Sequence, residues 1–180
     1  MKRLRAPSRA GFSMIELMVV LAILTMGVSM FSSTLVSTAR QSQAKREIAI
    51  AAEGARRAME LMRSQSCEIL FATYNESSAD DPGGAGTAPG KHFVVTGLTL
   101  RDGDKDGFVG EILFPTVETA LREDVVDTVL GMPRDLDGDN QVDNANHAAN
   151  YVLLPVHVRI QWKGVSGDVS FDLYNQFVKQ

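Results

Sequence analysis

The sequence predicts an α+β protein in which a long N-terminal helix packs on a small antiparallel β-sheet head. An apolar run from Phe12 to Phe31 continues, without a proline, into a helical pattern that ends near Phe71. Residues 72–180 carry loop and strand signals instead and form the predicted globular, β-rich head. Within that head, apolar and polar residues alternate in two neighbouring segments, which predicts a hairpin with one face toward a core.

Residues 12–36 form the first part of the predicted helix and are apolar on nearly every side. The run from Phe12 to Phe31 has 20 residues, and a helix of that length spans about 30 Å, enough for a bilayer core. A helix that is apolar all round is buried in lipid or in other protein, so we expect a transmembrane or filament-core helix here. Basic residues before it should stay cytoplasmic and place the head outside the cytoplasm: Lys2, Arg3, Arg5 and Arg9.

One carboxylate interrupts this apolar run. Glu16 lies in the junction Gly11-Phe12-Ser13-Met14-Ile15-Glu16, and a charge at a membrane-helix centre costs roughly 2.5–3.5 kcal/mol, so it normally has a dedicated partner. An ordinary secretory signal is the alternative, but its apolar region has about 7–15 residues and a small-residue cleavage site follows it. No Ala-x-Ala site closes this longer run.

The junction from Gly11 to Glu16 resembles the cleavage and methylation site of type IV pilins and of the pseudopilins of type II secretion. The resemblance implies that residues 1–11 are a leader, that prepilin peptidase cuts after Gly11, and that the new terminus, Phe12, is methylated. It also implies that Glu16 registers each subunit against its neighbour during assembly. The implied partners are prepilin peptidase, other pilin or pseudopilin subunits and the inner membrane.

Residues 37–71 form the second, amphipathic part of the predicted helix. One stripe should cover the sheet, because its residues recur at spacings of four and three: Ile48, Ala52, Ala55, Met59, Met62, Ser66 and Ile69. The opposite face is charged and should be solvated or contact other subunits: Glu47, Glu53, Arg56, Arg57, Glu60 and Arg63. Gly27 and Gly54 lower helix propensity locally and either permit bending or close helix approach, or are simply tolerated small residues.

The head begins with a loop over residues 75–90, which is rich in glycine and proline. Strands are predicted over residues 91–100, 111–114, 156–162 and 169–173. Residues 115–130 are ambiguous, because Glu118 and Arg122 favour a helical turn while the valines that follow favour a strand. The terminal hairpin looks like the C-terminal half of minor pilins of the type IV pilus modification class, a looser likeness than the N-terminal motif.

Two acidic loops in the head are candidate calcium sites. In the first, aspartates at alternate positions precede a glycine, and the backbone carbonyl of Phe108 adds an oxygen ligand. Leu113 occupies the twelfth position of that loop, where a calcium loop has a bidentate acidic residue, so its affinity should be modest. The candidate ligands of this first loop are Asp102, Asp104, Asp106 and Phe108.

The second loop is the better match, because it has the spacing of dockerin-like calcium loops. Asn140 stands where such a loop has its bend glycine and tolerates positive φ, while Asn146 weakly occupies the twelfth position. The candidate ligands are Asp135, Asp137, Asp139, Gln141 through its carbonyl, and Asp143. Calcium is thus the one cofactor that the sequence suggests. The alternative is that both segments are solvated turns, since aspartate and asparagine form turns without metal.

Composition excludes several classes of function. The formal net charge is −4, and removal of residues 1–11 would leave 14 basic against 22 acidic residues, a net charge of −8. So acidic a protein is not expected to bind nucleic acid directly. The sequence contains no Gly-x-Ser-x-Gly, no phosphate-binding loop and no Cys or His cluster with zinc spacing, so we do not expect an enzyme. With Cys67 alone, no intrachain disulfide can form.

Two functions follow. The first is a structural minor pilin or pseudopilin, processed by prepilin peptidase and assembled in a type IV pilus or type II secretion filament. The alternative is a membrane-anchored periplasmic calcium-binding module in which residues 12–31 are an uncleaved anchor. The sequence does not separate pilus, secretion and DNA-uptake machines, and gene neighbourhood would best distinguish them. It also does not separate a major from a minor subunit.

Overall fold

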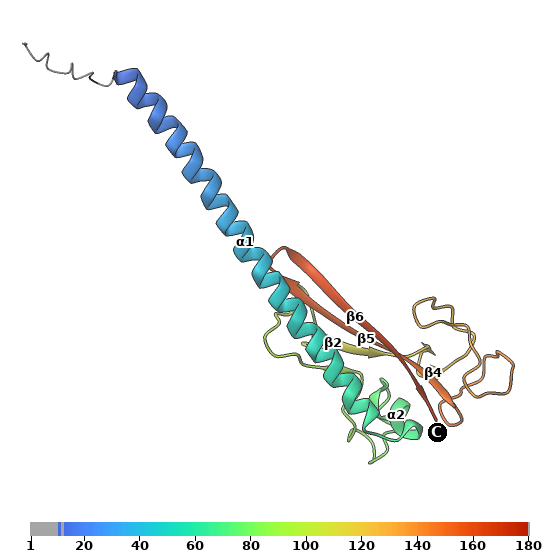
Figure 1. The fold of residues 1–180 in the computed structure, drawn as a ribbon. Coiled ribbons are helices and arrows are strands. Elements are labelled where there is room, and N and C mark those ends of the chain that lie inside the picture. Colours follow the sequence, from blue (N-terminus) through green and yellow to red (C-terminus); the bar gives the residue numbers. More distant parts are fainter. Residues whose placement is uncertain (1–10, 12, 180) are drawn as a thin grey trace, which may run out of the picture. The chain divides into compact units, whose positions relative to one another are not determined.

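The structure is a computed structural model that describes Gly11 and residues 13–179 (Figure 1). The rest of the predicted leader and Phe12, the predicted mature terminus, lie outside the described residues. The chain divides into two compact units, one up to Ser42 and one from Gln43 onward. The arrangement of a long N-terminal helix and an antiparallel sheet confirms the α+β fold class.

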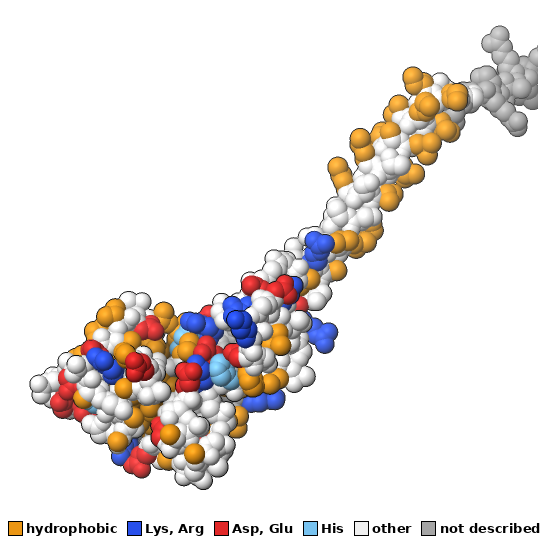
Figure 2. Space-filling view, turned by 180° about the vertical axis from the view of Figure 1, so that it is seen from behind, with side chains coloured by type: hydrophobic (Ala, Val, Ile, Leu, Met, Phe, Trp, Pro, Cys, Tyr) orange, Lys and Arg blue, Asp and Glu red, His pale blue; other side chains and the backbone are white. Residues whose placement is uncertain are grey.

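Helix α1 runs from Met14 to Arg63, and its first part makes up most of the first unit. An 18-residue window near its start has a mean hydropathy of 2.2 and is 0% buried, so by length and composition this helix can cross a membrane. Apolar side chains cover this part of α1 (Figure 2). Five of its hydroxyl groups donate to carbonyls three or four residues earlier in the same helix, and they belong to Thr25, Ser29, Ser33, Thr34 and Thr38. Bonds of this kind reduce the cost of burying a hydroxyl in an apolar environment.

The second unit begins within α1, and here one side of the helix is buried. The predicted stripe is correct at Ala55, Met59 and Met62, but Ile48 is 45% exposed and Ile69 39% exposed. The buried residues of α1 are Ala51, Ala55, Ala58, Met59 and Met62. Three alanines leave short side chains at the contact with the sheet layer, which lets the backbones approach closely.

Gly54 marks the closest part of this contact. A Cβ atom at Gly54 would lie 2.9 Å from both Cγ methyls of Val95 and 3.5 Å from Cδ1 of Ile160. The structure therefore favours close helix approach over a merely tolerated small residue at this position. A side chain at Gly54 would push α1 away from the residues it covers.

The prediction of one helix continuing to Phe71 was wrong. Helix α1 ends at Arg63, Ser66 has extended backbone with φ −65° and ψ 135°, and a second helix, α2, runs from Cys67 to Tyr74. The hydroxyl of Tyr151 donates to the carbonyl of Cys67 and accepts from the Phe71 N–H at 3.2 Å. Burial raises the pKa of Tyr151 to about 12, so the hydroxyl keeps its proton. A straight helix would leave these tertiary bonds unmade.

The sheet of the head has four antiparallel strands in the order β1-β2-β5-β6. They are β1 (His92–Phe93), β2 (Gly110–Leu113), β5 (Leu153–Gly164) and β6 (Gly167–Val178). The predicted strand at 111–114 and the predicted hairpin are confirmed, and the hairpin is longer than expected. The prediction over 91–100 was wrong beyond Phe93, because the chain turns at Gly97 with φ 95°.

The ambiguous segment 115–130 contains a small separate hairpin of β3 (Thr116–Val117) and β4 (Ala120–Leu121). Glu118 at its turn has φ 55°, so the helical turn considered for this residue does not form.

The core lies between α1 and the inner face of β5. The predicted inward residues Val156, Val158 and Ile160 are 0% exposed, and Trp162 is 1% exposed. The indole N–H of Trp162 donates to Glu47 of α1 at 3.3 Å, which satisfies its one polar atom. The helix therefore covers the face that the alternating pattern predicted.

Truncation of one core side chain should test this packing. Leu154 of β5 is 0% exposed, so Leu154→Ala should lower the free energy of unfolding by about 2–5 kcal/mol. Leu61→Ala, at a residue of α1 that is 56% exposed, is the control and should change it by less than about 0.5 kcal/mol. Denaturant unfolding of the detergent-purified chain, followed by the fluorescence of Trp162, measures both. Equal effects of the two variants would contradict the assigned core.

Candidate functional site

Gly11 and Glu16 are the predicted processing and assembly residues that the structure describes. Gly11 is exposed, and a Cβ atom built on it would meet nothing within 4 Å. Nothing in the described part of the chain therefore requires glycine at this position, and any requirement has to come from a partner.

Glu16 lies in the first turn of α1, where its charge suits the positive end of the helix dipole. Its N–H donates to the Ser13 carbonyl at 3.0 Å. Its side chain is exposed among apolar neighbours, and within residue 11 and residues 13–179 no Lys, Arg or His lies within 4.0 Å of its carboxylate. A compensating cation for Glu16 is therefore absent from that part of the chain.

The comparisons with known proteins bear on this same segment. A family model described as the prokaryotic N-terminal methylation motif matches residues 7–32. The chain carries the type IV pilin and pseudopilin signature. Searches of curated proteins and of solved structures found no match. The match confirms the resemblance inferred from Gly11 to Glu16, and it covers the segment where α1 begins.

The signature has consequences for the general function of the chain. It implies processing by prepilin peptidase and assembly with other pilins. It points to a structural protein rather than an enzyme. Together with the apolar start of α1, it fits an inner-membrane anchor that later enters a pilus.

The first acidic loop does not bring its three carboxylates together at one point. Asp104 accepts backbone N–H groups from Asp106 at 3.1 Å and Gly107 at 3.3 Å, and Asp106 accepts from Phe108 at 3.0 Å. The bond from Phe108 lowers the pKa of Asp106. Asp102 points elsewhere and pairs with Lys163 of β5. In the described part of the chain these aspartates form no group that could hold a metal.

The second acidic loop has the predicted bend. Asn140 has φ 64°, as expected for the residue in place of the bend glycine. Asp135 accepts the Gly138 N–H at 2.6 Å and the Asn140 N–H at 2.8 Å. The bond from Gly138 is the main reason that the pKa of Asp135 is lowered, so this carboxylate stays ionised.

Sequence reasoning missed Glu123, which lies at the centre of this site. Glu123 follows β4 and is only 1% exposed. Its carboxylate accepts the N–H groups of Leu136 at 2.6 Å, Asp137 at 3.3 Å and Asp143 at 3.2 Å. These partners lie 13, 14 and 20 residues away along the chain, so no local pattern could have identified Glu123.

His147 is the second residue that was missed, since a surface or strand-face position was expected for it. Its side chain is 5% exposed, and Nε2 lies 3.0 Å from Asp143 and 3.7 Å from Glu123. Burial lowers the pKa of His147, but the hydrogen bond to Asp143 and the charges of Glu123 and Asp137 outweigh burial and raise it.

The structure therefore brings together some of the predicted ligands and not others. Ligand atoms of Glu123, Asp135 and Asp137 lie within 4.8 Å of one another, and so do those of Glu123, Asp143 and His147. Asp139 is exposed and belongs to neither group, and the predicted role of the Gln141 carbonyl stays a prediction. Asp139 instead accepts the Gln141 N–H at 2.7 Å, which shapes the turn.

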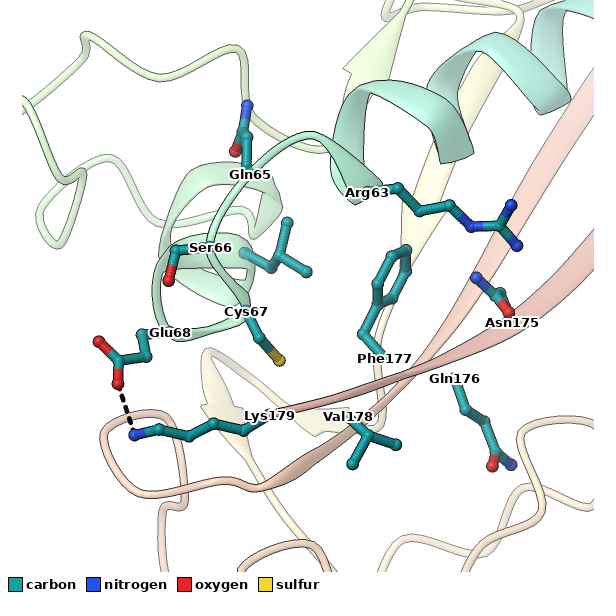
Figure 3. Close-up of a pocket in the computed structure, with 11 residues that line it drawn as sticks. Arg63, Gln65, Ser66, Cys67, Glu68, Asn175, Gln176, Phe177, Val178 and Lys179 are labelled. Carbon is teal, nitrogen blue, oxygen red and sulfur yellow. Dashed lines mark ion pairs between the residues drawn. The ribbon is translucent and has the colours of Figure 1, made fainter.

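A pocket of about 600 Å³ lies between the end of α1, the start of α2 and the end of β6 (Figure 3). Lys179 pairs with Glu68 at 2.5 Å beside Cys67. Burial raises the pKa of the Cys67 thiol, which disfavours the reactive thiolate. The residues lining this pocket include no histidine that could activate the thiol.

Proposed function

We propose that this chain is a minor subunit of a type IV pilus or of a type II secretion pseudopilus. Prepilin peptidase cuts after Gly11, and Phe12 becomes the methylated terminus. The observation that carries the proposal is the methylation motif at residues 7–32, which runs directly into helix α1.

The first part of α1 supports this assignment. Its large apolar side chains, such as Leu17 at 55% and Phe31 at 66% exposure, are not covered by other residues in the described part of the chain. Such a surface needs lipid or other protein. A subunit that waits in the membrane and then enters a filament meets both environments in turn.

The choice of a minor subunit rests on the sequence pattern of the terminal hairpin, β5 and β6, which resembles that of minor pilins of the type IV pilus modification class. Basic residues before the anchor favour a head outside the cytoplasm. Its acidic composition fits partners that are other subunits rather than nucleic acid.

The mature N-terminus separates this function from a membrane-anchored calcium-binding module. Intact mass of the chain purified from membranes should show loss of residues 1–11 and one added methyl group. Cells that lack prepilin peptidase provide the control and should yield the full mass. An unprocessed chain in cells that have the peptidase would favour the anchored module instead.

A further inference from the structure

We propose that the head binds one calcium ion between the carboxylates of Glu123, Asp135 and Asp137. The site stands apart from the filament function and would exist in the isolated subunit. The site combines two aspartates of the acidic loop with Glu123, a buried residue from a distant part of the chain. The ion would therefore connect the segment after β4 to the loop that follows Leu130.

The distances fit one ion. Oxygen atoms from Glu123, Asp135 and Asp137 lie within 4.8 Å of one another. Calcium binds oxygen at about 2.3–2.6 Å, so two oxygens on opposite sides of one ion are roughly 5 Å apart. Each carboxylate already accepts backbone N–H groups, but a carboxylate oxygen has a second lone pair that remains available.

The local excess of negative charge favours binding of a cation. Glu123 is 1% exposed, and three aspartates of the loop surround it: Asp135, Asp137 and Asp143. Within the described residues, no Lys or Arg lies within 4.0 Å of any of these four carboxylates, and His147 is the one basic side chain that does. A protonated imidazole would offset one of four negative charges, whereas a divalent cation offsets two more.

A buried nitrogen without a partner gives an independent indication of a ligand. Nδ1 of His147 is buried and has no hydrogen-bond partner, and it faces Asp137 Oδ2 at 3.4 Å. Nε2 of the same ring lies 3.0 Å from Oδ1 of Asp143, so both ring nitrogens face carboxylates of the loop. Calcium keeps water among its ligands. A water on the ion would give Nδ1 the hydrogen-bond partner that it lacks.

The choice of calcium rests on the donor atoms. Three carboxylates give the oxygen-only set that hard cations prefer. Asp135 and Asp137 occupy the first and third positions of the loop, and Asn140 makes the bend at the sixth. The neighbouring group of Glu123, Asp143 and His147 contains a nitrogen and would suit zinc, so zinc is the competing ion in the test.

Thermal unfolding of the full chain in detergent tests the site. After chelator treatment, calcium at about 100 times its dissociation constant should raise Tm by roughly 5–10 °C. Asp137→Asn should abolish this shift. Asp139→Asn, in the same exposed loop but outside the cluster, is the matched control and should keep it. Isothermal titration with calcium alone should give one site per chain.

Three results would overturn the proposal. The first is no Tm shift at millimolar calcium, and the second is the same shift in Asp137→Asn as in the unmodified chain. The third is binding of zinc without binding of calcium, which would assign the nitrogen-containing group instead. Glu123→Gln provides a second variant in case Asp137→Asn unfolds, and far-UV circular dichroism of both checks that the head is intact.

Discussion

Gly11→Val should leave the chain uncleaved in the inner membrane. The described part of the chain places nothing within 4 Å of a Cβ atom at Gly11, so valine should not disturb the protein itself. The peptidase, by contrast, has to accommodate the backbone next to the scissile bond. A barrier raised by 1.36 kcal/mol slows cleavage tenfold, and we expect a loss larger than about tenfold, measured as the ratio of precursor to mature chain on immunoblots.

Gly27→Val is the matched control for this experiment. Gly27 lies within α1, and a Cβ atom there also meets nothing within 4 Å. Because Gly27 lies far along the chain from the scissile bond, Gly27→Val should be cleaved normally. If Gly11→Val is processed at the rate of the unmodified chain, the leader assignment is wrong.

Glu16→Leu should be inserted and cleaved normally and yet be missing from filaments. Leucine suits the apolar segment better than a carboxylate, whose uncompensated charge costs roughly 2.5–3.5 kcal/mol at a membrane-helix centre. The charge is favourable only beside a cation, and the family resemblance supplies one, the α-amine of Phe12 on an adjacent subunit. Loss of this pair should reduce incorporation at least about tenfold, measured in sheared filament fractions.

Two further variants separate charge from shape in the Glu16 experiment. Glu16→Gln keeps the size of the side chain but removes the charge, and it should fail as Glu16→Leu does. Met18→Leu changes an exposed apolar neighbour without changing charge and should assemble normally. Incorporation of Glu16→Leu at unmodified levels would exclude the proposed role in register.

The features that depend on contiguous residues could be predicted from the sequence. Gly11 and Glu16 lie in one short motif, and that motif alone identified the signature that the family model matches. The alternation from Val156 to Trp162 predicted the inward face of β5, because the side-chain period of a strand is two regardless of its surroundings. The bend at Asn140 was also predictable from local sequence, since asparagine is one of the few residues that tolerate positive φ.

The tertiary structure alone decided the features that depend on distant contacts. The Ser64-Gln65-Ser66 segment is weakly helical, and the bonds from Tyr151 to Cys67 and Phe71 favour its break. The sequence predicted Asp135 and Asp137 of the candidate ion site but not Glu123. Glu123 contacts the acidic loop through backbone groups that lie 13 to 20 residues away along the chain. Local propensities differ by a few tenths of a kcal/mol per residue, whereas each buried polar group without a partner costs about 1–3 kcal/mol. Where the two conflict, the long-range contacts determine the structure.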